Sequence, residues 1–310
     1  MRVVFMGSAE LSCPSLENII AADDFEVVSV VTQPDRPRGR QLQASPGPVT
    51  RVASRHGLEV LTPQRVNSPE SLDAIRTCRP DFIVVVAYGQ ILSRSLLDIP
   101  KLDCVNVHTS LLPRYRGAAP IQWAIVNGET ETGVTTMRMI EALDAGDILL
   151  QEVVAIGMDE TAGTLHDRLA VIGATLLMRT LAGLIDGTIA AVAQKSDLAT
   201  YAPRLKKEHG RIDWTLSAHE IYNRIRGFNP WPGCTVRVPG QSEPVKIHRA
   251  KVEKASGKPG EVLEASEGGI LVASSCDGIR LLEVQPAGGR SMACAAYVRG
   301  HHVTPGMMLQ

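Results

Sequence analysis

One short run, FIVVVAY at residues 82–88, constrains the fold of this chain more than any other feature. The run is apolar on both faces, which is typical of a strand covered by helices on both sides of a parallel sheet. Two other β-rich runs precede it, RVVFM at 2–6 and EVVSVV at 26–31. We therefore expect the N-terminal half to contain a central sheet with FIVVVAY near its middle.

Helical patterns alternate with these strands. The sequence Ser68-Pro69-Glu70 offers an N-cap, a proline for the first turn and an acidic residue near the positive helix end. Helices are also predicted over 119–127 and 165–185, and further strands over 105–108 and 134–139. Alternation of this kind predicts an α/β, doubly wound sheet.

The pattern changes after residue 187. A capping box, Ser217-Ala218-His219-Glu220, predicts a helix, and NPWPG at 229–233 interrupts the chain. Short strand-like runs follow (TVRV, PVKIHRAKV, GEVLEA, GILVASS and IRLLEVQP), which suit an OB-like β-barrel. We expect a catalytic domain at 1–188, a linker at 189–205 and a C-terminal OB-like domain at 206–310.

The charge is uneven along the chain. The whole sequence has a net charge of -1, whereas residues 206–310 hold 14 Lys and Arg against 10 Asp and Glu, a net of +4. A mildly basic C-terminal third suits a nucleic-acid or phosphate partner, and a solvated surface is the alternative. A hydrophobic content of 44% excludes wholesale disorder.

The cysteines and the N-terminus bear on location. Six cysteines are scattered with no C-x-x-C pair, so no zinc or redox site is expected. They suit reduced thiols in a cytoplasmic protein. The run RVVFM at 2–6 predicts a strand at once, so we expect no signal peptide, and no apolar run approaches the ~18 residues that span a bilayer. We expect a cytoplasmic protein that does not enter a membrane.

Several familiar catalytic motifs are missing. No two glycines are separated by one residue, so the G-x-G-x-x-G dinucleotide fingerprint is absent. The P-loop, H-E-x-x-H and G-x-S-x-G patterns are absent as well.

The candidate catalytic residues lie at the end of the strand predicted over 105–108. Asn106 and His108 share one face of that strand, near the carboxyl edge where open α/β sheets bind ligands. A neutral amide and an imidazole in this spacing can stabilise one oxyanion together. The alternative is a hydrogen-bonded histidine at the end of a strand.

Asp144 lies in a loop after the strand predicted over 134–139. Near His108 it can hold the imidazolium and order a water that relays a proton, and a turn or capping role is the alternative. Ser110, His108 and Asp144 also have the residue types of a hydrolase triad, but the serine lacks its nucleophile elbow.

The segments NVHTSLLPRYRGAAPIQWAI (106–125), GVTTM (133–137) and LDAGD (143–147) resemble the folate-dependent formyltransferase family. TQPDRPRGR (32–40), GRIDW (210–214) and FNPWP (228–232) are similar to the members of that family that act on tRNA. The resemblance covers nearly the whole chain. The segment GSAEL at 7–11 departs from the family pattern, and so does the loop after TQPDRP.

The resemblance implies a Rossmann-like formyltransferase domain. It implies transfer of a formyl group from 10-formyltetrahydrofolate to the α-amine of methionyl initiator tRNA, by a monomer and without a metal. It assigns catalysis to Asn106, His108 and Asp144, and the folate pocket to Ser110, Leu111, Leu112 and Pro113. On sequence alone, Arg36, Arg38 and Arg40 belong either to a solvated loop or to a basic finger that contacts tRNA phosphates, and the resemblance favours the finger.

Two rival functions remain at this point. A formyltransferase of the same chemistry can act on a sugar amine or on glycinamide ribonucleotide, although such small substrates need neither the RGR loop nor a basic barrel. A non-catalytic RNA-binding protein on a Rossmann-like scaffold would not need the set of Asn106, His108 and Asp144.

Overall fold

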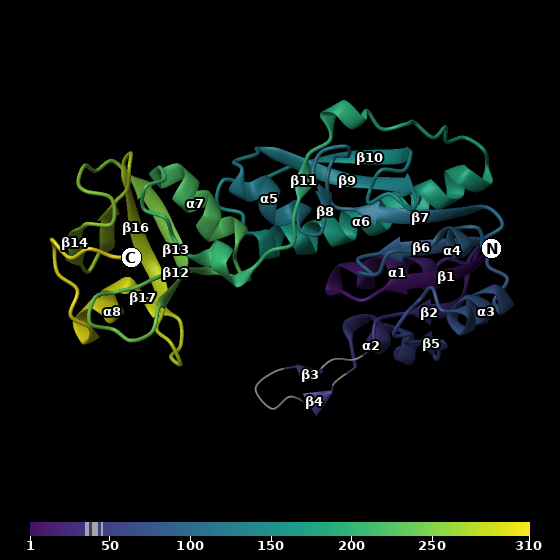
Figure 1. Ribbon diagram of the computed structural model, residues 1–310, viewed down its shortest axis with the longest axis horizontal. Coiled ribbons are helices and arrows are strands. Elements are labelled where there is room, and N and C mark those ends of the chain that lie inside the picture. The colour runs from purple at the N-terminus through teal and green to yellow at the C-terminus, as the bar shows by residue number, and fades with distance from the viewer. Residues whose placement is uncertain (35–36, 39–42, 45) are drawn as a thin grey trace. The chain divides into compact units, whose positions relative to one another are not determined.

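The computed structural model describes residues 1–34, 37–38, 43–44 and 46–310, with only the backbone at 37–38 and 43–44 (Figure 1). The chain divides into two compact units, each built from three segments. The first unit contains Met1–Gly117, Thr132–Ala155 and His166–Ala202, and the second contains Ala118–Glu131, Ile156–Leu165 and Pro203–Gln310. The boundaries expected from sequence, 1–188, 189–205 and 206–310, stay a prediction.

The first unit is built on a seven-stranded sheet. From one edge to the other the strands are β10 (Ile148–Ala155), β9 (Glu131–Arg138), β7 (Asp103–His108), β6 (Phe82–Val86), β1 (Arg2–Gly7), β2 (Glu26–Val31) and β5 (Val60–Leu61).

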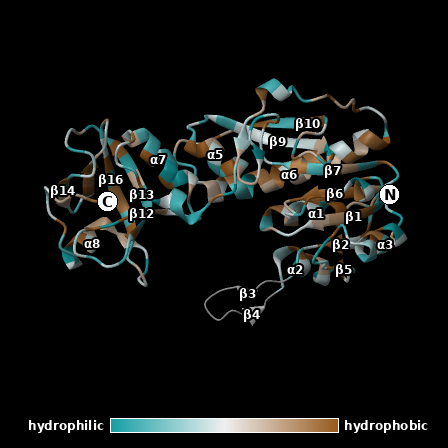
Figure 2. Ribbon diagram, in the orientation of Figure 1, coloured by the Kyte–Doolittle hydropathy of each residue, from teal (hydrophilic) through white to brown (hydrophobic). Residues whose placement is uncertain are grey.

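The central position of FIVVVAY is confirmed. Strand β6 has four of its five residues at most 1% exposed and lies in the middle of the sheet, which Figure 2 shows as hydrophobic. It pairs in parallel with β1 and β7, and β1 pairs in parallel with β2. Strand β9 runs antiparallel to β7, so the sheet is mixed rather than wholly parallel.

The helix start that the sequence signals at Ser68 is confirmed in the first unit. Ser68 caps the third helix, where its hydroxyl accepts a hydrogen bond from the Ser71 amide at 3.3 Å. The 3₁₀ turns are η1 (Glu10–Ser12) and η2 (Ser196–Leu198), and the short strands are β3 (Pro37–Arg38), β4 (Gln43–Ala44), β8 (Arg116–Gly117) and β11 (Tyr201–Ala202). The helices are α1 (Cys13–Ile20), α2 (Pro48–Arg55), α3 (Pro69–Thr77), α4 (Arg94–Leu97) and most of α6 (Ala162–Ile185).

Helix α6 corrects one expectation. Its mean hydropathy of 1.6 over an 18-residue window makes it long and apolar enough to cross a membrane, so the expectation that no apolar stretch approaches that length is wrong. Half of that window is buried in the protein, however, and a core helix passes the same test. Gly173 of α6 packs against Val107 of β7, and the Thr180 hydroxyl lies 2.7 Å from the Thr136 hydroxyl of β9. The helix therefore covers one face of the sheet.

The second unit contains an antiparallel sheet in the region where the sequence predicts an OB-like β-barrel. Its strands β12 to β16 pair in the order β12-β13-β16-β15-β14, and β17 pairs with β16. The capping box forms as predicted, because the Glu220 carboxylate accepts the Ser217 amide at 2.9 Å at the start of α7. The elements are α5 (Pro120–Val126), η3 (Lys207–Gly210), α7 (Ala218–Gly227), β12 (Cys234–Val236), β13 (Val245–Glu253), β14 (Val262–Ser266), β15 (Gly269–Ala273), β16 (Gly278–Gln285), β17 (Met292–Ala293) and α8 (Cys294–Gly300).

Candidate active site

Asn106 and His108 lie at the carboxyl end of β7. Val107, between them, contacts Gly173 of α6, so alternation along the strand directs Asn106 and His108 to the other face of the sheet. Their exposed fractions are 8% and 7%. Among the residues that the structure describes, none hydrogen bonds to the Asn106 side chain, so its amide is available to a ligand.

The imidazole of His108 faces an oxygen on each side. Its Nε2 atom lies 2.9 Å from the carbonyl oxygen of Tyr115, and its Nδ1 atom lies 3.8 Å from Oδ2 of Asp144. A carbonyl oxygen only accepts, so Nε2 carries a proton. Nδ1 therefore faces the Asp144 carboxylate, while Nε2 has the hydrogen bond of a strand-end histidine.

Asp144 is held in a loop after β9. Its backbone has φ of +48°, which is uncommon for a residue other than glycine. The carboxylate accepts a hydrogen bond from the backbone amide of Gly117 at 2.7 Å and is mostly buried. Asp144 thus has the expected turn role and also faces His108.

The hydrolase alternative is wrong. The Ser110 side chain is fully buried, and its hydroxyl donates to the carbonyl of Arg114 at 2.6 Å. A hydroxyl with its proton committed to a backbone carbonyl, and with no hydrogen bond to His108, is not an activated nucleophile.

The segment Ser110–Pro113 is a fixed loop. The Thr135 hydroxyl donates to the Ser110 carbonyl at 2.6 Å and accepts from the Leu112 amide at 3.2 Å. Gln151 donates to the Leu112 carbonyl and to the Thr135 hydroxyl, both at 2.9 Å. Leu111 and Pro113 are partly exposed, whereas Ser110 and Leu112 are buried. Contact of these four residues with folate stays a prediction.

Ser8, in the segment GSAEL that departs from the family pattern, forms hydrogen bonds to residues that follow neighbouring strands of the sheet. The Ser8 hydroxyl, just after β1, accepts from the Gln33 amide at 3.1 Å and donates to the Tyr88 carbonyl at 3.2 Å. Gln33 also donates to Tyr88 through its side chain at 2.9 Å. These bonds join the carboxyl ends of β1, β2 and β6 at the edge where β7 ends.

The predicted basic finger lies mostly outside the described residues. Arg36 and Arg40 are not among them, and Arg38 is described only as part of the backbone pairing of β3 with β4. The tRNA contacts of all three arginines stay a prediction.

Two other features do not supply a site. Within the described ranges, no group of three or more His, Cys, Asp or Glu is placed to hold a metal ion. An open depression of about 580 Å³ lies between α1 and α2, but its Arg51 and Arg55 pair with Glu10 and Glu17 at 3.0 and 2.9 Å. We place the chemistry at β7 because the unengaged amide and the His–Asp pair are there.

Sequence reasoning missed the residues that support this site. Gly117 lies in one of the segments that carry the resemblance, but nothing in the sequence showed that its amide meets Asp144. Thr135 and Gln151 lie far along the chain from the Ser110 and Leu112 carbonyls that accept their hydrogen bonds, and neither belongs to a spacing pattern that predicts such a bond.

The chain matches two family models in chain order. Residues 1–181 match the model "Formyl transferase", and residues 204–302 match "Formyl transferase, C-terminal domain". The chain therefore belongs to the formyl transferase family, as the resemblance implied.

The chain is also similar, over nearly its whole length, to proteins of one named activity. The chain is 47% identical over 309 residues to a methionyl-tRNA formyltransferase of Geobacter sulfurreducens, covering 100% of this chain and 96% of the relative. It is 45% identical over 309 residues to a methionyl-tRNA formyltransferase of Bacillus velezensis, covering 99% and 97%.

Solved structures support the fold. A sugar 3N-formyl transferase, WlaRD, aligns with a TM-score of 0.67 at 20% identity over 91% of this chain and 97% of that one. A phosphoribosylglycinamide formyltransferase from Bacillus halodurans aligns with a TM-score of 0.52 at 26% identity. The alignment covers 60% of this chain and 95% of that chain. The fold class expected from sequence is confirmed.

Proposed function

We propose that this formyltransferase transfers the formyl group of 10-formyltetrahydrofolate to the α-amine of methionyl initiator tRNA, for translation initiation. The observation that carries the chemistry is the unengaged Asn106 amide beside the His108–Asp144 pair at the carboxyl end of β7. The full-length similarity to methionyl-tRNA formyltransferases supports the choice of amine.

The amine nitrogen attacks the formyl carbon, and the carbonyl electron pair moves onto oxygen. The Asn106 amide donates a hydrogen bond to this oxyanion, and the charged imidazole of His108 stabilises it electrostatically. Both groups are held by a strand in a largely water-excluded environment, where such interactions are stronger than in water.

The proton leaves the amine as the new C–N bond forms. Asp144, with one oxygen fixed by the Gly117 amide, orders a water that carries this proton to the folate N10 atom. The bond between the formyl carbon and N10 then breaks, and the formyl amide and tetrahydrofolate are released. Each of these groups is a side chain or a water, so the scheme uses no metal.

The substrates are assigned to different parts of the chain. We propose that Ser110, Leu111, Leu112 and Pro113 form part of the folate pocket, held by Thr135 and Gln151. We propose that Arg36, Arg38 and Arg40 contact tRNA phosphates, together with the basic region 206–310, which we take as the tRNA-binding domain after a catalytic domain at 1–188 and a linker at 189–205.

A location follows from this role. Charged tRNA is used in the cytoplasm, and all six cysteines are free, as in a reducing compartment. We propose a cytoplasmic monomer that does not enter the membrane.

The rival function is the same chemistry on a small amine. The sugar transferase and the glycinamide ribonucleotide enzyme share the fold of the chain, but at 20% and 26% identity. The 47% identity to methionyl-tRNA formyltransferases extends through the second unit, which favours tRNA.

One assay separates these functions. Purified protein is mixed with 10-formyltetrahydrofolate and either charged methionyl-tRNA, uncharged tRNA, a nucleotide-linked amino sugar or glycinamide ribonucleotide. Folate is consumed only with charged methionyl-tRNA if the proposal is correct. Consumption with a small amine and none with charged tRNA would overturn it.

A further inference from the structure

The segment 192–202, here called the strap, is fastened at both ends to the first unit. At its start, Val192 and Ile148 exchange backbone hydrogen bonds of 2.8 and 2.9 Å. At its end, β11 pairs in parallel with β8, with Tyr201 opposite Arg116 and Ala202 opposite Gly117. The strap lies within the range that the sequence predicts to be a linker.

Within the strap, Gln194 binds two separate parts of the chain at once. Its Oε1 atom accepts from Nε and Nη2 of the buried Arg116, at 3.1 and 2.7 Å. Its Nε2 atom donates to the carbonyls of Asp144 at 2.9 Å and Gly146 at 2.7 Å. Two acceptor and two donor positions are the whole capacity of a carboxamide, so the orientation of Gln194 is fully determined.

The loop that Gln194 holds is in an unfavourable conformation. Asp144 has a left-handed backbone, and a Cβ atom at Gly146 would lie 1.9 Å from the carbonyl oxygen of Arg138. Such conformations persist only where surrounding contacts impose them. The two carbonyl hydrogen bonds from Gln194 are contacts of this kind.

The strap also fixes the segment on the other side of the pair. Thr200 accepts the Tyr115 amide through its hydroxyl and the Arg116 amide through its carbonyl, both at 2.8 Å. The Tyr115 carbonyl accepts from His108, and the Gly117 amide donates to Asp144. The strap therefore reaches both His108 and Asp144 through residues 115–117.

We propose that the strap is a positioning element for the His108–Asp144 pair, with Gln194 as the positioning residue of Asp144. The expected effect on kcat rests on the proposed function, whereas the expected effect on the Asp144 loop does not depend on any substrate. Loss of the Gln194 hydrogen bonds lets the Asp144 loop shift, so the water relay is misplaced while the folate and tRNA contacts remain.

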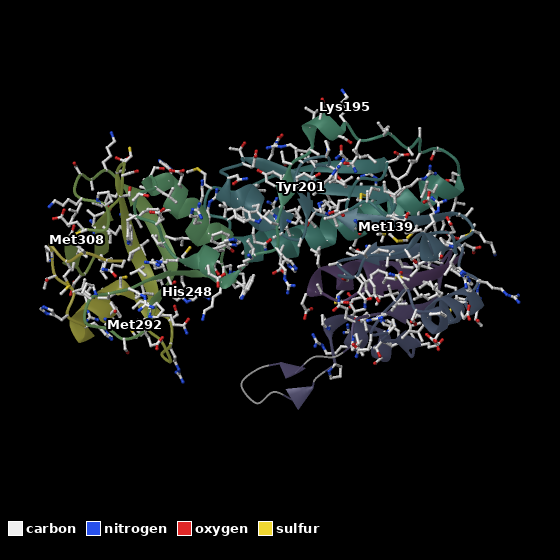
Figure 3. The ribbon with its side chains drawn as sticks, in the orientation of Figure 1. Met139, Lys195, Tyr201, His248, Met292 and Met308 are labelled. Atoms are coloured by element: carbon white, nitrogen blue, oxygen red, sulfur yellow. The ribbon has the colours of Figure 1, made fainter. Side chains whose placement is uncertain are left out.

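The test uses the full-length chain with Gln194→Glu, which keeps the size of the side chain and its contact with Arg116 but places an acceptor against two carbonyls. Lys195→Ala is the matched control, because Lys195 is the next residue in the strap and its side chain is exposed (Figure 3). Thr200→Val removes the hydroxyl that accepts the Tyr115 amide, and it is the second test variant if Gln194→Glu does not fold. Hydrogen exchange of the Gly117 amide is measured without substrates, and kcat and KM are measured with them.

Gln194→Glu is expected to speed exchange at Gly117 by roughly tenfold or more, because this amide bonds to Asp144. It is expected to lower kcat by roughly 10–100-fold, the scale of a small misplacement of catalytic groups, with KM for either substrate within about threefold. In an Asp144→Asn background it should cause little further loss, since it acts through Asp144.

Unchanged exchange at Gly117 in both Gln194→Glu and Thr200→Val overturns the proposal, and so does an undiminished further loss of kcat in the Asp144→Asn background. If the parent chain does not formylate methionyl-tRNA, the proposed function fails, and the exchange measurement alone decides the role of the strap.

Discussion

The Nδ1 atom of His108 lies 3.8 Å from Oδ2 of Asp144, so the end of strand β7 and a loop from another part of the chain meet at one histidine–carboxylate pair. The pair stands beside Asn106, whose amide none of the described residues engages. An amide and an imidazole beside a carboxylate suit a reaction that creates an oxyanion and moves one proton.

Replacing the oxyanion donors tests the chemistry. Asn106→Ala and His108→Ala should each lower kcat by roughly 10²–10³, the usual loss for an oxyanion donor. The affinity for 10-formyltetrahydrofolate, measured by binding without tRNA, should remain close to that of the parent. Near-normal turnover in either variant would contradict the mechanism.

Replacing Asp144 tests the need for its charge. Asp144→Asn keeps an oxygen that can accept the Gly117 amide but removes the negative charge that faces His108. Turnover should fall by roughly 10²–10⁴, the range for a positioned acid–base group, with folate affinity little changed. Parental turnover would mean that the carboxylate charge has no part in the reaction.

Thr135 tests the loop assigned to folate. Thr135→Val should weaken 10-formyltetrahydrofolate binding by roughly three- to tenfold, because the Ser110–Pro113 loop loses the hydroxyl that joins two of its backbone groups. Thr136→Val is the matched control, since Thr136 is equally buried but bonds to Thr180 of α6. An equal effect of both variants on folate binding would show that the loop assignment is wrong.

The C-terminal sheet contains a pH-dependent ion network. Hydrogen bonds from the buried Arg280 lower the pKa of Glu253 from its ordinary value of 4.5 to about 2 and also lower the pKa of Glu264. A carboxylate with a lowered pKa stabilises the fold above its unfolded pKa, and this stability is lost as the pH falls toward the folded value.

Glu253→Gln should therefore lower the free energy of unfolding at pH 7 by about 1 kcal/mol, a modest figure because a third of the Glu253 side chain is exposed and solvent screens the pair. This difference from the parent should fade between about pH 4.5 and pH 2 in thermal or urea unfolding. Glu267→Gln, at an exposed position in the turn between β14 and β15, is the control. A difference that stays constant with pH would rule out the network as its source.

Local signals in the sequence predict elements of both units. FIVVVAY placed β6 in the middle of the sheet, and Ser68 and Ser217 marked helix starts that form as expected. The antiparallel direction of β9 was not predictable, because side-chain alternation is the same in either direction.

The site was predictable only in part. Asn106 and His108 share a strand, so side-chain alternation alone puts them on one face. Asp144 was assigned to the same site through the family resemblance. Gln194 escaped prediction because it lies some fifty residues after the carbonyl of Asp144 to which it donates, and tertiary hydrogen bonds over such separations leave no local pattern.

The basic finger tests the partner. Arg36, Arg38 and Arg40 changed together to Ala should weaken tRNA binding and flatten the slope of log K against log salt by roughly one unit for each phosphate that is no longer neutralised. Folate binding, measured on the same proteins, should barely change. Unaltered tRNA affinity and salt slope would mean that these arginines do not bind tRNA.

Direct detection of the product tests the central claim. The protein is incubated with 10-formyltetrahydrofolate and charged methionyl initiator tRNA, and the amino acid released from the tRNA is identified by mass spectrometry, with the Asn106→Ala variant alongside. The account predicts N-formylmethionine with the parent chain and a roughly 10²–10³-fold lower rate with the variant. Unmodified methionine with active, folate-binding parent protein, or equal rates for parent and variant, would contradict it.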